Sequence, residues 1–225
     1  MRPRLLHAFV GACNRPLALA PYPVMVVIGV TGSFGTGKSM VAKMLQELGA
    51  VVLDADVFSR EAMEPKRLAW RRIIETFGEQ VLNEDQTVDR RALARVVFSD
   101  AQARRRLEEI IHPQVLRRMK QQLHRLRRQR GVRAAVLDVP LLVEAGARDL
   151  VDVLVVVVAP AEVQRERLTK KYGWTDEEVM QRIEAQLDIS AKVALADHVV
   201  DNGDGLERTR RQVRQIWYKA LASDR

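Results

Sequence analysis

One short stretch constrains this chain more than any other feature of its sequence. Residues 32–39 read Gly-Ser-Phe-Gly-Thr-Gly-Lys-Ser and match the pattern Gly-x-x-x-x-Gly-Lys-Ser/Thr. The apolar, β-branched run at 24–30 predicts a buried strand before it, and the residues after it predict a helix that ends at Gly49. A glycine-rich turn between a strand and a helix is the setting in which this pattern forms a phosphate-binding loop, the P-loop.

This loop predicts a binding site for ATP with Mg²⁺. Backbone N–H groups of the turn point at phosphate oxygens, and the dipole of the following helix adds to the attraction. Lys38 is expected to reach the β- and γ-phosphates, the Ser39 hydroxyl to ligate Mg²⁺, and the backbone N–H of Met40 to face the α-phosphate. The residues of this loop predicted to bind ATP are Gly32, Gly35, Thr36, Gly37, Lys38, Ser39 and Met40.

The rest of the chain predicts a three-layer α/β fold. Helical stretches alternate with short apolar runs, which is typical of a parallel sheet with helices on both faces. Ligands of such sheets bind beyond the carboxyl ends of the strands. Strands are expected at 51–54, 134–139, 151–158 and 198–200, and helices through most of 59–130 (with a break at His112-Pro113), at 160–171, after the capping box Thr175–Glu178 and at the C-terminus.

Aspartates lie at two of these strand ends. Alternation along the strand places Asp54 and Asp56 on one side, with Ala55 opposite. Asp56 lies farther past the strand end and is the preferred candidate to accept a proton from an attacking hydroxyl, with a capping or turn role for the pair as the alternative. Asp138 ends the third strand, where it is either a Mg²⁺ ligand or a polar strand end.

A lid is predicted near 165–182. Gln164, Arg167 and Lys171 fall on one helical face, and the segment 172–174, Tyr-Gly-Trp, is a candidate hinge. A mobile segment that carries cations suits phosphoryl transfer, because negative charge builds up on the transferred group. An exposed basic helix is the alternative.

Length and charge limit the class of protein. A chain of 225 residues suits one globular domain, expected at 25–222. The net charge is +8, and 104–133 alone holds eleven Lys or Arg against two Glu. Apolar residues recur there at helical spacing, so a solvated helix face is the simplest interpretation, with an acidic small molecule or a nucleic acid as alternatives.

Other features exclude further classes. The single cysteine, Cys13, rules out an internal disulfide, and no apolar run reaches the roughly 18 residues of a membrane span. Residues 1–24 are basic and are expected to be a disordered extension, or to precede a true start at Met25.

Together these motifs resemble one family, the dephospho-coenzyme A kinases. The similarity spans about 26–213 and rests on an ordered set of motifs, since the P-loop alone marks only a superfamily. The set comprises Gly32–Ser39, Asp54–Asp56, Asp89–Leu93 with Val97 and Phe98, Ile111–Pro113, Pro140–Glu144, Gln164 with Arg167, Arg182 with Gln186, and Ala196 and Asp197 with Asn202.

The resemblance implies a P-loop kinase that transfers the γ-phosphate of ATP to the ribose 3′-hydroxyl of dephospho-coenzyme A, the last step of coenzyme A synthesis. It also implies that 59–130 binds the acceptor and that 165–182 is the lid. The implied roles are a base at Asp56, acceptor contacts at Arg90 and His112, a lid cation at Arg167 and an adenine neighbour at Asn202.

Two positions depart from the family pattern. Ser33 and Phe34 replace the usual Gly-Ile, which crowds the loop without removing its required glycines. Lys171 stands where the family usually has a second lid arginine, and lysine lacks the bidentate fork of arginine.

Two other functions stay open at this point. One is a different nucleoside or nucleotide kinase of the P-loop class, and the other is a basic P-loop ATPase that acts on nucleic acid. Against the ATPase, the third strand lacks a clear acid pair to activate water, and the basic segment has almost no aromatic residues for base stacking. We therefore expect a cytoplasmic monomer that binds a small-molecule acceptor and neither nucleic acid nor membrane.

Overall fold

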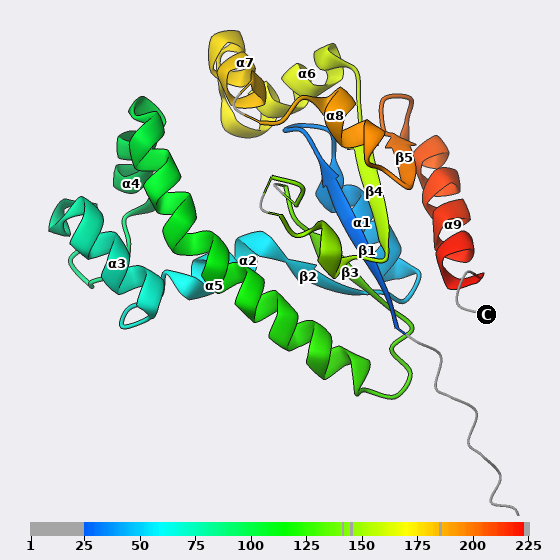
Figure 1. The fold of residues 1–225 in the computed structure, drawn as a ribbon. Coiled ribbons are helices and arrows are strands. Elements are labelled where there is room, and N and C mark those ends of the chain that lie inside the picture. The colour runs from blue at the N-terminus through cyan, green and yellow to red at the C-terminus, as the bar shows by residue number, and fades with distance from the viewer. Residues whose placement is uncertain (1–24, 141, 145, 185, 223–225) are drawn as a thin grey trace, which may run out of the picture.

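The computed structural model describes residues 25–222 apart from 141, 145 and 185. Within these residues, five strands form one parallel sheet in the spatial order β2-β3-β1-β4-β5 (Figure 1). The expected α/β fold is therefore confirmed, whereas the extension expected at 1–24 lies outside the described residues. The strands are β1 (Val26–Gly32), β2 (Val51–Asp54), β3 (Ala134–Asp138), β4 (Val153–Val158) and β5 (His198–Asp201).

Helices connect the strands and cover both faces of the sheet, as parallel pairing requires. None of the helices that the structure describes is both long and apolar enough to cross a membrane. In chain order the helices are α1 (Lys38–Glu47), α2 (Ala55–Ala62), α3 (Leu68–Phe77), η1 (Glu79–Val81), α4 (Arg90–Ser99), α5 (Ala101–Arg127), η2 (Arg148–Leu150), α6 (Ala161–Tyr172), α7 (Asp176–Glu184), α8 (Ile189–Ala194) and α9 (Leu206–Ala222).

Each face of the sheet has its own hydrophobic core, because successive side chains of a strand point to opposite faces. Ile28 of β1 belongs to a buried cluster with Val41 of α1 and Trp217 of α9. The neighbouring residue, Val27, belongs to the cluster on the other face, with Met119 of α5. Two adjacent residues of β1 thus anchor helices on opposite sides of the sheet.

A third buried cluster lies away from the sheet, among α3, η1, α4 and the first half of α5. It includes Ile73, Val81, Leu93 and Ile110. In Figure 1 these helices stand beside the sheet, and α6 and α7 lie over its carboxyl edge. The long helix α5 therefore joins the two parts, since its second half packs on the sheet through residues such as Leu123.

The expected helix break at His112-Pro113 is wrong, because α5 continues through both residues with Pro113 inside it. Proline has no N–H, so the carbonyl of Glu109, four residues earlier, loses its helical donor. Pro113 and Glu109 are both exposed, and water can satisfy that carbonyl. Buried residues on either side, Ile110 and Val115, hold the helix against two cores at once.

The core of the sheet yields a test of the fold. Ile28 is fully buried, so Ile28→Ala leaves a cavity and should lower the free energy of unfolding by about 2–5 kcal/mol, measured by urea denaturation. Val199 on β5 is 42% exposed, so Val199→Ala is the control and should lower the free energy of unfolding by less than about 1 kcal/mol. Equal losses in the two variants would contradict the assigned core.

Candidate active site

The P-loop joins β1 to α1 at the carboxyl edge of the sheet, and its path depends on glycine. Gly35 and Gly37 have φ values of 75° and 91°, which residues with a Cβ rarely adopt. A Cβ on Gly32 would lie 2.3 Å from the carbonyl oxygen of Val157. Gly37 is the N-cap of α1 and supplies no side-chain cap, so the first N–H groups of the helix are available to a phosphate.

The backbone N–H of Met40 already has a partner within the protein. Its N–H donates to the carbonyl of Gly37 at 3.0 Å, within the first turn of α1. A contact with an α-phosphate would have to share this N–H, so the role of Met40 stays a prediction.

Asn202, which follows β5, holds the loop through a hydrogen bond to its backbone. Its side-chain amide donates to the carbonyl of Thr36 at 2.8 Å, and its side-chain oxygen accepts from the Thr209 hydroxyl at 2.9 Å. Thr36 is itself buried and donates to the carbonyl of Ser33 at 2.9 Å. The structure places Asn202 next to the loop, with its amide engaged in these bonds, and the adenine contact stays a prediction. Sequence patterns gave no indication of the bond from Thr209.

Arg167 links α6, where the sequence predicts the lid, to the same loop. Its guanidinium donates to the carbonyls of Gly35 and Thr36, each at 3.3 Å, and to the carbonyl of Asn202 at 2.9 Å. The side chain therefore contacts the loop backbone, and its predicted contact with the transferred phosphate stays a prediction. Lys171 lies elsewhere, exposed at the end of α6 with its ammonium 4.9 Å from the centre of the Tyr172 ring.

Lys38 crosses the loop, and its Nζ donates to the carbonyl of Ser33 at 2.9 Å. Burial lowers the pKa of this ammonium to about 8, while the negative charge of Asp138 acts in the opposite direction. Asp56 also raises the pKa of Lys38, so the lysine and both acids share one electrostatic site. A partly desolvated cation at this point binds polyphosphate strongly, because little water competes for its charge.

Asp54 has a capping role, as the alternative interpretation of the sequence allowed. Helix α2 begins at Ala55, and the Oδ1 of Asp54 accepts the N–H of Asp56 at 2.7 Å. The prediction that strand alternation places Asp54 and Asp56 on one side is therefore wrong, because β2 ends at Asp54 and α2 begins at Ala55. Asp56 instead lies exposed in the first turn of α2.

Asp138 lies beside Ser39 at the end of β3. It pairs in register with Asp54 of β2 and is 6% exposed. Burial raises the pKa of the Asp138 carboxyl, and the negative charge of Asp54 raises it further, whereas a hydrogen bond with the Ser39 side chain lowers it. The two strand ends thus gather carboxylate and hydroxyl oxygens next to the first turn of α1.

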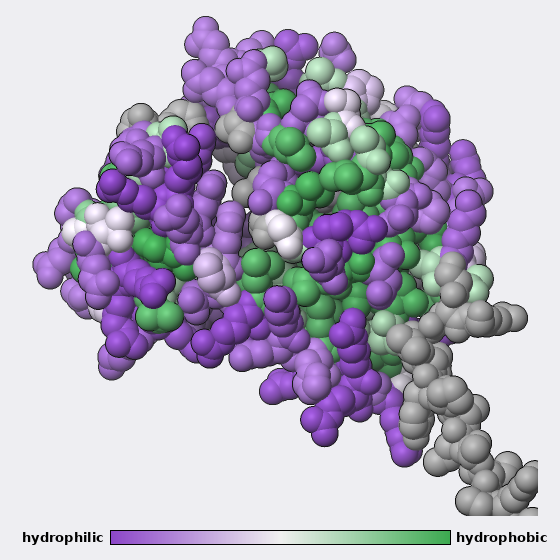
Figure 2. Space-filling model, viewed as in Figure 1, coloured by the Kyte–Doolittle hydropathy of each residue, from purple (hydrophilic) through white to green (hydrophobic). Residues whose placement is uncertain are grey.

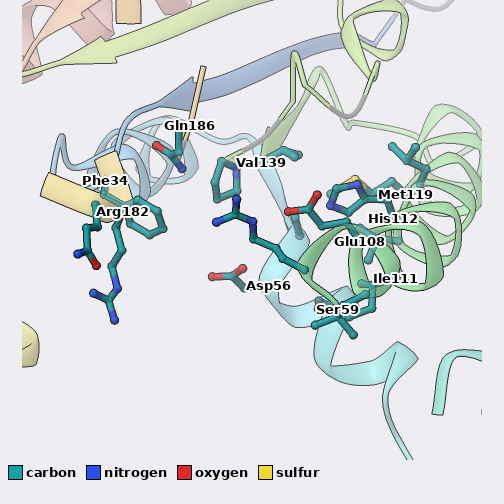
Figure 3. A pocket seen from close by; sticks show the side chains of 17 residues that line it. Phe34, Asp56, Ser59, Glu108, Ile111, His112, Met119, Val139, Arg182 and Gln186 are labelled. Carbon is teal, nitrogen blue, oxygen red and sulfur yellow. The ribbon is translucent and has the colours of Figure 1, made fainter. Parts of the chain in front are cut away.

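A cavity of about 460 Å³ adjoins the loop, in the hollow between the α3–α5 region and the body of the molecule (Figures 2 and 3). Asp56 lies between its two sides. One side carries Phe34 and Arg182, and the other carries Glu108 and His112 of α5. Most of the remaining lining is apolar, from α5 and the segment 139–140. This arrangement can hold a molecule that packs apolar surface against α5 and carries several polar or charged groups, one of them at Asp56.

The cavity includes some predicted acceptor residues and omits another. Asp56 and His112 line it, whereas Arg90, exposed at the start of α4, is not among its lining residues. Arg104 and Glu108 line it too, although the sequence marked them only as part of a solvated basic segment. Their positions eight and four residues before His112 place all three on one face of α5, a signal that was available in the sequence.

Aromatic side chains connect the segment between α6 and α7, within the predicted lid, to the loop. The Phe34 ring meets the Trp174 ring edge-on, with centroids 6.4 Å apart, and Tyr172 stacks on Trp174 at 4.4 Å. The guanidinium carbon of Arg182 on α7 lies 3.9 Å from the centroid of Trp174. Phe34, one of the two departures from the family pattern, is thus a contact between the loop and the predicted lid.

Fold and site together define a class of protein, the P-loop kinases, since the cavity for a second substrate opens directly beside the phosphate-binding loop. The model of the dephospho-CoA kinase family matches residues 26–208. A dephospho-CoA kinase of Geobacter metallireducens is 44% identical over 197 residues, which cover 88% of this chain and 98% of that protein. The chain therefore belongs to the dephospho-CoA kinase family.

Solved structures share the fold of this chain. A crystal structure from Thermus thermophilus has a TM-score of 0.75 at 32% identity and covers 88% of this chain and 98% of its own. The dephospho-CoA kinase from Campylobacter jejuni, at 23% identity, shares the fold with a TM-score of 0.66 and covers the same shares, 88% and 98%.

The position of Lys38 leads to a prediction for catalysis. Lys38→Ala should lower turnover at least ~10²-fold, because the cation predicted to stabilise the transferred phosphate is removed. The measurement is a coupled assay of ADP release, with circular dichroism to confirm that the fold is kept. Lys43→Ala, an exposed lysine of α1, is the matched control and should leave turnover unchanged. Near-normal turnover of Lys38→Ala would contradict the assignment of the P-loop.

Proposed function

We propose that this chain transfers the γ-phosphate of ATP to the ribose 3′-hydroxyl of dephospho-coenzyme A, giving coenzyme A and ADP. The observation that carries the proposal is the position of Asp56, which lines the acceptor cavity and interacts electrostatically with Lys38 of the P-loop. Membership of the dephospho-CoA kinase family supports the choice of acceptor.

Asp56 is the proposed general base. As the acceptor oxygen bonds to the γ-phosphorus, Asp56 takes the hydroxyl proton, and the bond from the γ-phosphorus to the β–γ bridging oxygen breaks to release ADP. Lys38 stabilises the negative charge that collects on the β- and γ-phosphate oxygens. Arg167 on α6 contacts the loop, so it is close enough to assist Lys38 in this stabilisation when a nucleotide is bound.

Ser39 and Asp138 are the proposed Mg²⁺ site. Mg²⁺ prefers oxygen ligands and commonly takes one or two from the protein and the rest from phosphates and water. A hydroxyl and a carboxylate in hydrogen-bond contact beside the P-loop fit that requirement. When bound, the ion neutralises charge on the β- and γ-phosphates. The backbone of Gly32–Ser39 and the side chain of Asn202 complete the proposed ATP site.

The cavity suits dephospho-coenzyme A in its chemistry. The mostly apolar lining from α5 can pack against an adenine ring or the pantetheine arm, and Arg104 and Arg182 can pair with the pyrophosphate. We propose 59–130 as the acceptor region, with His112 in contact and Arg90 nearby on α4, and 165–182 as the lid. A monomeric state, a cytoplasmic location and the absence of nucleic-acid binding stay predictions.

A panel of acceptors tests the substrate. We expect kcat/KM for dephospho-coenzyme A to exceed that for any nucleoside monophosphate at least ~10³-fold, about 4 kcal/mol of differential transition-state binding. Phosphorus NMR should locate the new phosphate on the ribose 3′-oxygen. Faster use of AMP or CMP, or a phosphoanhydride in the product, would favour a nucleotide kinase. Stimulation of ATP hydrolysis by RNA or DNA would favour a nucleic-acid ATPase.

Substitution of the two aspartates tests the base. Asp56→Asn keeps the shape but removes the basicity, so turnover should fall ~10²–10⁴-fold while the Kd for ATP changes little. Asp54→Asn is the comparison, because asparagine also caps helices and should cost little turnover. A larger loss of turnover in Asp54→Asn would transfer the role of base to that residue.

A further inference from the structure

Lys192 of α8 is a lysine with a fully buried side chain, 0% exposed. Lysine is almost never fully buried without a partner, because removing its ammonium from water is costly. Its Nζ lies 2.7 Å from Oε1 of Glu144 and 3.4 Å from the carbonyl oxygen of Pro140. The reaction described above gives this buried ion pair no role.

Glu144 connects the Lys192 ammonium to the segment that follows α7. The Oε1 of Glu144 that pairs with Lys192 also accepts the backbone N–H of Leu187, at 3.3 Å. Leu187 follows α7 and comes directly after Gln186. The ion pair therefore fixes the backbone position from which the Gln186 side chain extends.

Gln186 presents an unsatisfied polar atom at the acceptor cavity. It lines the cavity on the same side as Phe34 and Arg182 (Figure 3). In the part of the chain that the structure describes, its Oε1 is buried without a hydrogen-bond partner. Buried polar atoms are nearly always paired, and an unpaired one is destabilising. A ligand in the cavity that donates a hydroxyl, amide or amino hydrogen would satisfy this oxygen.

The second contact of Lys192 reaches the strand that leads into the P-loop. The carbonyl of Pro140, which lines the cavity, also accepts the hydroxyl of Thr31 at 3.0 Å. Thr31 lies in β1, directly before Gly32. The positive charge of Lys192 also contributes to the lowered pKa of Lys38, as expected for an ammonium near the loop.

We propose that Gln186 binds the acceptor through its side-chain oxygen and that Lys192 is the positioning residue for this contact. Lys192 acts through Glu144 on the backbone at Leu187, and it also contacts Pro140, which lines the same cavity. The proposal deepens the proposed function and rests on it, because the acceptor is the molecule that occupies this cavity.

Gln186→Met tests the contact. Methionine has nearly the same length and no polar oxygen, so the Kd for dephospho-coenzyme A, measured by calorimetry, should rise at least ~5-fold. The Kd for ATP should stay within about twofold, and Tm should stay equal or rise, because an unpaired buried oxygen has been removed. A side chain with only a structural role would instead lower Tm. An acceptor Kd within twofold of the unmodified protein would overturn the contact.

A double-mutant cycle tests the positioning role. Lys192→Met alone should weaken acceptor binding at least ~5-fold and lower Tm, because Glu144 loses its partner. In the Gln186→Met background the same substitution should weaken acceptor binding less than twofold further, because both act through one contact. Full additivity of the two effects on acceptor Kd would overturn the positioning role.

A second variant covers the case in which Lys192→Met does not fold. Lys192→Met combined with Glu144→Leu removes both charges, so Tm should recover while acceptor binding stays weak. Recovery of both would show that the pair serves stability alone. Lys43→Met, at an exposed lysine of α1, is the control and should change neither value.

The unmodified protein separates this proposal from the proposed function. If it fails to bind or phosphorylate dephospho-coenzyme A, the proposed function is wrong before any variant is made. If it binds and phosphorylates dephospho-coenzyme A but Gln186→Met binds it equally well, only the contact is wrong.

Discussion

The backbone N–H groups at the start of α1, which no side chain caps, are the constraint on which the rest of the structure depends. They can face a phosphate only if no side chain caps the helix, and Gly37 supplies none. The loop before them then has to hold an unusual backbone path. Thr36, Asn202 and Arg167 hold it by hydrogen bonds from three separate parts of the chain.

Charge at this edge of the sheet is balanced over short distances. Burial lowers the pKa of Lys38 and raises the pKa of Asp138, so it disfavours the charged form of both groups. The negative charge of Asp138 partly offsets the shift at Lys38, and the positive charge of Lys38 partly offsets the shift at Asp138. Asp54 and Asp138 lie side by side because β2 and β3 pair in parallel register. The proposed metal ion and polyphosphate would supply charges opposite to those of the carboxylates and of Lys38.

One wall of the proposed acceptor cavity is formed by α5 rather than by the sheet. Because this helix continues through Pro113, one rigid element packs on the sheet at one end and on the α3–α4 cluster at the other. Glu108 and His112 therefore have a fixed position relative to Asp56. The opposite wall comes from the segment after β3 and from the residues that follow α7, and Lys192 contacts both through Pro140 and Glu144. The proposed kinase activity needs both walls to meet the loop.

The sequence by itself determined the local elements, the phosphate-binding loop and the family, because these depend on periodicity, glycine spacing and motifs close together in the chain. It indicated Asp56 but for a partly wrong reason, since whether a strand continues past Asp54 depends on the packing of α2. It gave no indication of the Lys192–Glu144 pair. Their partnership joins positions far apart in the chain, and burial of a lysine follows no local pattern. Only the tertiary structure decides which side chains are removed from water together, because desolvation depends on everything that packs around them.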